Sequence, residues 1–83
     1  MDASEISERI QCFLEREFPN EGVALALDTN LLEDWFIDSL GITETVLFLE
    51  SSFGIRLSRA DISGENFKDI ESLSALVARR SAE

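Results

Sequence analysis

The sequence predicts an all-α fold, a four-helix bundle with three main helices and a short third one in chain order. Several segments carry apolar residues at helical spacing, no segment alternates strictly as a strand would, and helix-capping residues stand at the segment borders. A long connection separates the first two helices. Eighty-three residues leave room for one hydrophobic core, so we expect a single domain over residues 1–83.

The first helix is predicted over residues 4–18. Its apolar residues fall at i, i+4, i+7 and i+8 and form one stripe: Ile6, Ile10, Phe13 and Leu14. Ser4 is the expected N-cap, and Pro19 ends the helix because proline cannot continue the helical hydrogen bonds. Cys12 falls roughly opposite the stripe, so we expect an exposed thiol without a function.

The connection over residues 20–37 is unusually apolar for a loop and shows no regular period. We therefore expect it to lie on the core, with a short helical turn over 31–34 that follows Asn30. Trp35 and Phe36 stand at its end. They either cover the core or form a contact beside the functional site described below.

The second helix is expected to start with Asp38 or Ser39 as its cap, to run to Phe53 and to end at Gly54. One stripe is typical of a core face: Ile42, Val46, Leu49 and Phe53. On nearly the opposite side, a second stripe mixes apolar and acidic residues: Leu40, Thr43, Glu44, Leu47, Glu50 and Ser51. This second stripe is either half covered by the loop or available to a partner.

In the last part of the chain, the sequence predicts a short helical segment followed by a terminal helix. Residues 58–67 are broken by Gly64 and can hold a turn or two. Asp69 is the expected N-cap of the terminal helix, in which Arg79 and Arg80 complement the negative end of the helix dipole. Its apolar face consists of Ile70, Leu73, Leu76 and Val77.

Composition excludes several kinds of chemistry. The chain has no histidine and one cysteine, which rules out histidine-based triads, His or Cys zinc sites, iron–sulfur clusters and intrachain disulfides. Seventeen Asp and Glu against seven Lys and Arg give a net charge of −10. Such a surface repels phosphate backbones and anionic membranes, so we expect neither as a partner. The first residues lack the pattern of a secretion signal, so we expect a cytoplasmic protein. A monomer is the default expectation.

Asp38-Ser39-Leu40 lies where the apolar loop meets the second helix. A serine at this place is exposed and oriented, and the positive end of the helix dipole would stabilise a phosphate on its oxygen. The alternative is that Ser39 or Asp38 is only an N-cap.

The order and spacing of these elements over residues 27–77 resemble the acyl carrier protein family. The resemblance rests on Leu31-Leu32-Glu33-Asp34, on Asp38-Ser39-Leu40 at the start of a helix, and on Phe53-Gly54-Ile55 at its end. In that family the serine of Asp-Ser-Leu carries 4′-phosphopantetheine. The resemblance thus implies that Ser39 carries this cofactor, with Asp38 and Leu40 beside it, and that the chain is a carrier and not an enzyme.

The implied cargo is an acyl intermediate, held as a thioester and moved between enzymes of fatty acid, lipid or polyketide-type biosynthesis. The implied partners are a phosphopantetheinyl transferase that takes the arm from coenzyme A, a ligase or transferase that loads an acyl or aminoacyl group, and downstream biosynthetic enzymes. The family's recognition surface follows the modified serine and corresponds here to Leu40, Thr43, Glu44, Leu47 and Glu50.

Charge distribution agrees with docking by basic partners. No Lys or Arg lies between Arg16 and Arg56, whereas acids recur through the interval: Glu17, Glu21, Asp28, Glu33, Asp34, Asp38, Glu44 and Glu50. The family also shelters cargo between helices. Residues that could line such a pocket, or simply belong to the core, are Val46, Leu49, Ile62 and Phe67.

Departures from the family pattern leave the cargo open. Carriers of fatty acid synthases commonly have acids where this chain has Gly41, Ser51 and Ser52. The Leu-Leu-Glu and Ile-Asp-Ser-Leu-Gly stretches, together with Phe53-Gly54-Ile55, are also similar to free-standing carriers of specialised pathways, including D-alanyl and other aminoacyl carriers and polyketide-type ones. A different class, an unmodified acidic adaptor that binds a partner through Leu40 and Leu47, is the remaining alternative.

Overall fold

The computed structural model describes residues 2–18, 24–35 and 39–82. Along the chain these form α1 (Ala3–Glu17), α2 (Leu31–Asp34), α3 (Ser39–Phe53), the 3₁₀ turn η1 (Arg59–Asp61) and α4 (Ile70–Ser81). Within these ranges all regular structure is helical, which confirms the predicted all-α class with three main helices and a short third one. α2 is the turn expected inside the long connection.

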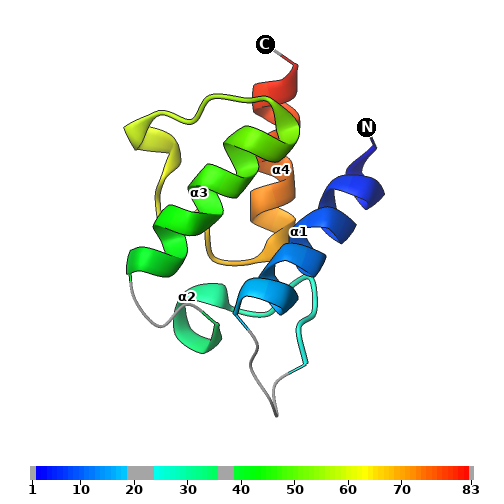
Figure 1. The fold of residues 1–83 in the computed structure, drawn as a ribbon, viewed down its shortest axis with the longest axis vertical. Helices are drawn as coiled ribbons and strands as arrows, with labels where there is room; N and C mark the ends of the chain where they lie inside the picture. Colours follow the sequence, from blue (N-terminus) through cyan, green and yellow to red (C-terminus); the bar gives the residue numbers. More distant parts are fainter. Residues whose placement is uncertain (1, 19–23, 36–38, 83) are drawn as a thin grey trace.

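The three long helices form a bundle in which α1 packs chiefly against α4 and α3 also contacts α4. α2 closes the end of the bundle at which α3 begins (Figure 1). The first turn of α1 and the last turn of α4 lie at the opposite end. The start of α3 is therefore remote from both ends of the described chain.

Helix caps follow the sequence with one correction. α1 is capped by Asp2 and not by Ser4: the Asp2 carboxylate accepts a hydrogen bond of 2.8 Å from the Glu5 N–H, and the helix already begins at Ala3. Aspartate satisfies a first-turn N–H as well as serine does, so the earlier residue takes the role. Asp69 caps α4 as predicted, and Gly54 follows α3 with a φ of +64°.

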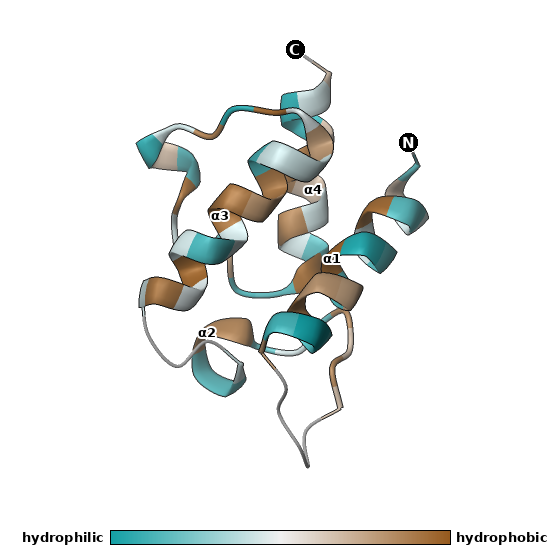
Figure 2. Cartoon of the chain, viewed as in Figure 1, coloured by the Kyte–Doolittle hydropathy of each residue, from teal (hydrophilic) through white to brown (hydrophobic). Residues whose placement is uncertain are grey.

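The core combines the predicted stripes of α1 and α4 with part of α3. Brown apolar residues recur along each long helix in Figure 2. All four predicted residues on α1 and all four on α4 are buried, whereas only Leu49 of the α3 stripe is fully buried. Ile42, Val46 and Phe53 are partly buried and pack against the core. The sequence did not predict that Thr45 is fully buried, with its Oγ1 donating to the Gly41 carbonyl oxygen at 2.8 Å.

The described part of the long connection, residues 24–35, lies on the core as predicted, with Leu25, Leu31 and Trp35 buried. Asn30 caps α2 by accepting from the N–H groups of Leu32 and Glu33. The Leu31 N–H donates to the Lys68 carbonyl at 2.7 Å, and the Glu71 N–H donates to the Leu27 carbonyl at 3.2 Å. These backbone bonds join the loop to the segment that leads into α4 and to the first turn of α4.

A polar network fixes the segment between α3 and α4. The Arg80 Nη2 donates to Asp61 Oδ1 at 2.6 Å, and Asp61 Oδ2 accepts from the Ser58 N–H at 2.9 Å. The hydrogen bond from Arg80 is the main reason why the pKa of Asp61 falls from 3.8 to about 2. The sequence predicts Arg80 only as a partner of the helix dipole, and the pattern gives no sign of this cross-link to Asp61.

Candidate functional site

Ser39 is the first residue of α3, and its side chain is exposed. This agrees with the predicted helix start, although Asp38 lies outside the described residues. The positive end of the α3 dipole lies at Ser39 and favours negative charge there. Thr43 Oγ1 donates to the Ser39 carbonyl oxygen at 3.1 Å, one turn along the helix. The hydroxyl thus stands on a regular helix end that is open to solvent.

Trp35 anchors the chain four positions before Ser39. Its side chain is buried, and its Nε1 donates to the Leu14 carbonyl oxygen of α1 at 3.3 Å. The core interpretation is therefore confirmed for Trp35. Phe36 lies outside the described residues. The last described residue before Ser39 is therefore held against α1.

The predicted recognition residues of α3 divide into two groups. Leu40 and Leu47 are about 60% exposed, which is high for leucine, and Thr43 and Glu44 are also exposed. Glu50 is only half exposed, and its Oε2 accepts a hydrogen bond of 3.0 Å from the Leu57 N–H. The exposed residues form a mixed apolar and acidic face, which we call the α3 face: Leu40, Thr43, Glu44 and Leu47. Glu50 also holds the chain that follows α3.

The residues suggested for a cargo pocket are mainly core residues in this structure. Leu49 and Phe67 are fully buried, and Val46 packs against the core. Ile62 is 41% exposed. Leu49, Phe67 and Val46 are therefore core residues in this structure.

The described residues offer little for other kinds of site. Among residues 2–18, 24–35 and 39–82 no group of three or more His, Cys, Asp or Glu could hold a metal ion. No helix in those ranges is long and apolar enough to cross a bilayer. Cys12 is exposed, as predicted.

One feature that sequence reasoning missed is a groove between α1 and α3, floored by a stacked pair of rings, Phe13 and Phe48. The helical pattern predicted Phe13 as a core residue but gave no sign of its pairing with Phe48. A contact between residues so distant in the chain depends on how the two helices cross, and amphipathic spacing does not encode this crossing.

Comparison with known proteins gives one informative match. No family model matches the chain. Over 68 residues the chain is 29% identical to a protein described as "Acyl carrier protein" from Onion yellows phytoplasma (strain OY-M). The match covers 82% of this chain and 87% of the relative. It spans nearly the whole of both proteins, so the similarity concerns the domain and not a short motif.

Proposed function

We propose that the chain is a distant member of the acyl carrier protein family, as its similarity to such a protein over 82% of its length supports, and that Ser39 is the attachment point of a 4′-phosphopantetheine arm taken from coenzyme A. The domain would carry an acyl group between enzymes of fatty acid, lipid or polyketide-type biosynthesis in the cytoplasm. Its role is that of a carrier and not of an enzyme. The observation that carries the proposal is the exposed hydroxyl of Ser39 at the first residue of a fifteen-residue helix.

The residues around Ser39 fit such a group. A phosphodiester on the Ser39 oxygen would lie at the positive end of the α3 dipole, which favours negative charge by about 0.3–1 kcal/mol. Ser39 is itself exposed, so its hydroxyl is accessible to a modifying enzyme. When bound, the arm supplies a terminal thiol on which cargo is held as a thioester. The chain itself positions the serine and presents the α3 face to partners.

The partners implied are those of a carrier: a phosphopantetheinyl transferase, a loading ligase or transferase, and downstream enzymes. Exposed Leu40 and Leu47 give the α3 face an apolar centre, and Glu44 adds negative charge. Opposite charge on a partner would speed encounter and fix its orientation, while the two leucines would supply buried apolar area. This combination suits brief docking to several enzymes.

The proposal is tested by intact-mass measurement of the protein after incubation with coenzyme A, Mg²⁺ and a broad-specificity phosphopantetheinyl transferase. The wild type should gain the mass of one phosphopantetheine, and Ser39→Ala should gain none. Ser51→Ala is the matched control, because Ser51 is exposed on the same helix and should not affect modification. Ser39→Ala should remain folded, since at most about 1 kcal/mol of helix-start stabilisation is lost.

Retained modification of Ser39→Ala would place the attachment elsewhere. No gain by the wild type, even with the cognate transferase, would favour the unmodified adaptor.

A second candidate differs only in cargo. The small residues Gly41, Ser51 and Ser52, at positions where carriers of fatty acid synthases commonly have acids, favour an aminoacyl carrier of the D-alanyl type. Loading of the modified protein with acyl ligases and with aminoacyl ligases, read by mass, separates the two cargo classes.

A further inference from the structure

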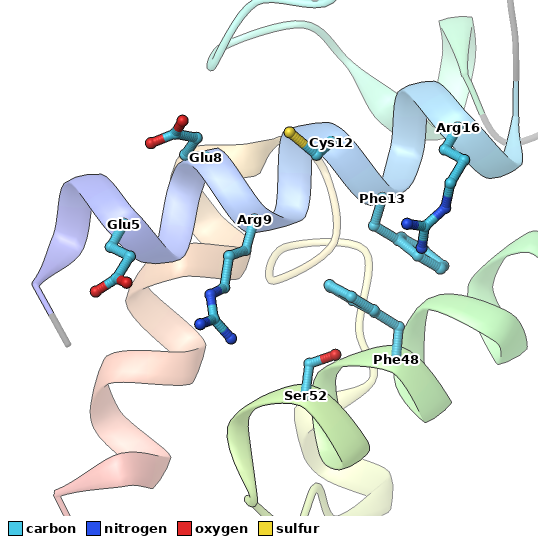
Figure 3. Close-up of a pocket in the computed structure, with 8 residues that line it drawn as sticks. All are labelled: Glu5, Glu8, Arg9, Cys12, Phe13, Arg16, Phe48 and Ser52. Atoms are coloured by element: carbon cyan, nitrogen blue, oxygen red, sulfur yellow. The ribbon is translucent and has the colours of Figure 1, made fainter.

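The groove between α1 and α3 has a volume of about 460 Å³ and is lined by both charged and aromatic side chains (Figure 3). We call it the α1–α3 groove. Its floor is the ring pair of Phe13 and Phe48, whose centroids are 4.0 Å apart with an angle of 10° between the ring planes. Phe18 and Phe53 meet this pair edge-on. The floor is thus apolar and held in place by aromatic packing.

The α1 wall of the groove carries a definite order of charges. Glu5, Arg9, Phe13 and Arg16 are spaced i, i+4, i+8 and i+11, so they lie along one face of α1. In Figure 3 the Arg9 and Arg16 side chains extend toward the α3 side of the groove and flank the ring pair, whereas Glu8 points away. The sequence of properties along the groove is acidic, basic, apolar and basic.

The two guanidinium groups have few partners among the described residues. Among residues 2–18, 24–35 and 39–82, no carboxylate lies within 4.0 Å of Arg9. Arg16 contacts its neighbour Glu17 at 3.4 Å, but both side chains are well exposed, so this pair is weak. In a chain with a net charge of −10, two exposed cations beside a partly buried aromatic pair indicate a binding surface for acidic groups.

We propose that the α1–α3 groove binds an amphipathic helix of a partner protein with the complementary order of side chains: basic opposite Glu5, acidic opposite Arg9, apolar over the Phe13–Phe48 pair, and acidic opposite Arg16. The face from Glu5 to Arg16 is about 16 Å long, the length of three helical turns. A helix matches the four positions because its own side chains repeat at the same spacing of four and three residues.

This surface differs in charge from the α3 face. A partner of the α3 face must tolerate or neutralise acidic side chains, whereas a partner of the groove must supply acids to Arg9 and Arg16. The proposal does not depend on modification of Ser39. The groove would give the domain a second class of partner. The order of charges along the groove would select this partner, and not the overall charge of the chain.

The test uses designed peptides of about 18 residues, long enough to form helix in water, with Lys, Glu, Leu and Glu at i, i+4, i+8 and i+11. The peptide is made in both sequence orders, because a helix can lie in the groove in either direction. A control peptide carries the opposite sign at each charged position. Binding to the full chain is followed by amide chemical shifts in 0.15 M salt, at which distant charges are screened.

We expect one order of the complementary peptide to bind, with shifts concentrated at Arg9, Phe13, Arg16, Phe48 and Ser52. The double variant Arg9→Gln/Arg16→Gln should weaken binding by about tenfold, the effect of two exposed ion pairs together. The matched control Arg56→Gln/Lys68→Gln removes two other exposed cations and should change affinity less than about twofold. Arg9→Glu/Arg16→Glu should lose affinity for the complementary peptide and gain affinity for the control peptide, whose two lysines face the new carboxylates. Thermal unfolding verifies that each variant is folded.

Absence of binding by both sequence orders would overturn the proposal, as would shifts centred on Leu40 and Leu47. An affinity that Arg9→Gln/Arg16→Gln leaves unchanged would also overturn it. A linear dicarboxylate, dodecanedioate, is titrated as the small-molecule alternative. If it shifts the groove residues while neither peptide does, the groove binds small amphipathic anions and not a helix.

Discussion

Replacing Trp35 by alanine should destabilise the protein more than any substitution on the α3 face. Trp35 is only 5% exposed and fills the space between the long connection and α1. Truncation of a buried tryptophan to alanine typically costs about 3–5 kcal/mol through lost burial and the cavity left behind. A domain of this length has a total stability of roughly 4–12 kcal/mol, so the loss is a large fraction of it.

Trp35→Phe separates burial from hydrogen bonding. Phenylalanine keeps most of the apolar volume but cannot donate to the Leu14 carbonyl oxygen. That oxygen still accepts from the Phe18 N–H at 2.9 Å, so it is not left without a donor. We therefore expect Trp35→Phe to cost only about 1 kcal/mol from the lost bond, plus a small packing term.

The assay is urea unfolding followed by circular dichroism, which reads helix content in all variants alike. Leu40→Ala is the control, because Leu40 is 61% exposed and its truncation should change stability by about 0.5 kcal/mol or less. In thermal unfolding, Trp35→Ala should lower Tm by roughly 12 °C or more, at 4–8 °C per kcal/mol. A loss below about 1 kcal/mol for Trp35→Ala would refute the view that this side chain anchors the loop to α1.

Two further predictions concern charged residues. Glu44→Lys should slow cargo transfer by partner enzymes and flatten the salt dependence of that transfer, with unchanged stability. Glu50→Lys should also lower the free energy of unfolding by about 1–3 kcal/mol, because the Glu50 carboxylate accepts from the Leu57 N–H. Unchanged transfer rates at low salt would remove the electrostatic argument. The Arg80 guanidinium lowers the pKa of Asp61 to about 2, so Asp61 stabilises the fold above the unfolded-chain pKa of about 4, and this stabilisation is lost as pH falls toward 2. Asp61→Asn should therefore flatten the decline of Tm between pH 4 and 2, and an equal decline in wild type and variant would contradict this.

The helices that could be predicted from sequence are those with one clear apolar face. α1 and α4 bury their predicted stripes because the opposite sides of both helices are polar. α3 is apolar on several sides, so spacing alone leaves its core face ambiguous. The structure resolves the ambiguity by burying Thr45, whose hydroxyl bonds within its own helix to the Gly41 carbonyl and so avoids an unsatisfied polar group.

The position of Ser39 at a helix start could be predicted from sequence more readily than its surroundings. A serine at a helix start is a local feature, and the structure has Ser39 as the first residue of α3. The bonds that join Glu50 to Leu57 and Arg80 to Asp61 depend on where the chain after α3 turns, and such turns follow from packing and not from local pattern. The same limit applies to the Phe13–Phe48 pair beneath the α1–α3 groove.

The bonds between the long connection and the start of α4 also bear on how the protein is made. Leu27 and Leu31 are tied by backbone hydrogen bonds to Glu71 and Lys68, and α1 has its main packing partner in α4. During synthesis on the ribosome, the first half of the chain therefore emerges without the contacts that hold its loop in place. These contacts link residues far apart in sequence and form only once α4 is present. The surface around Ser39 is thus completed only after α4 has been made and has packed, so an enzyme that requires the folded domain cannot act on a nascent chain that still lacks α4.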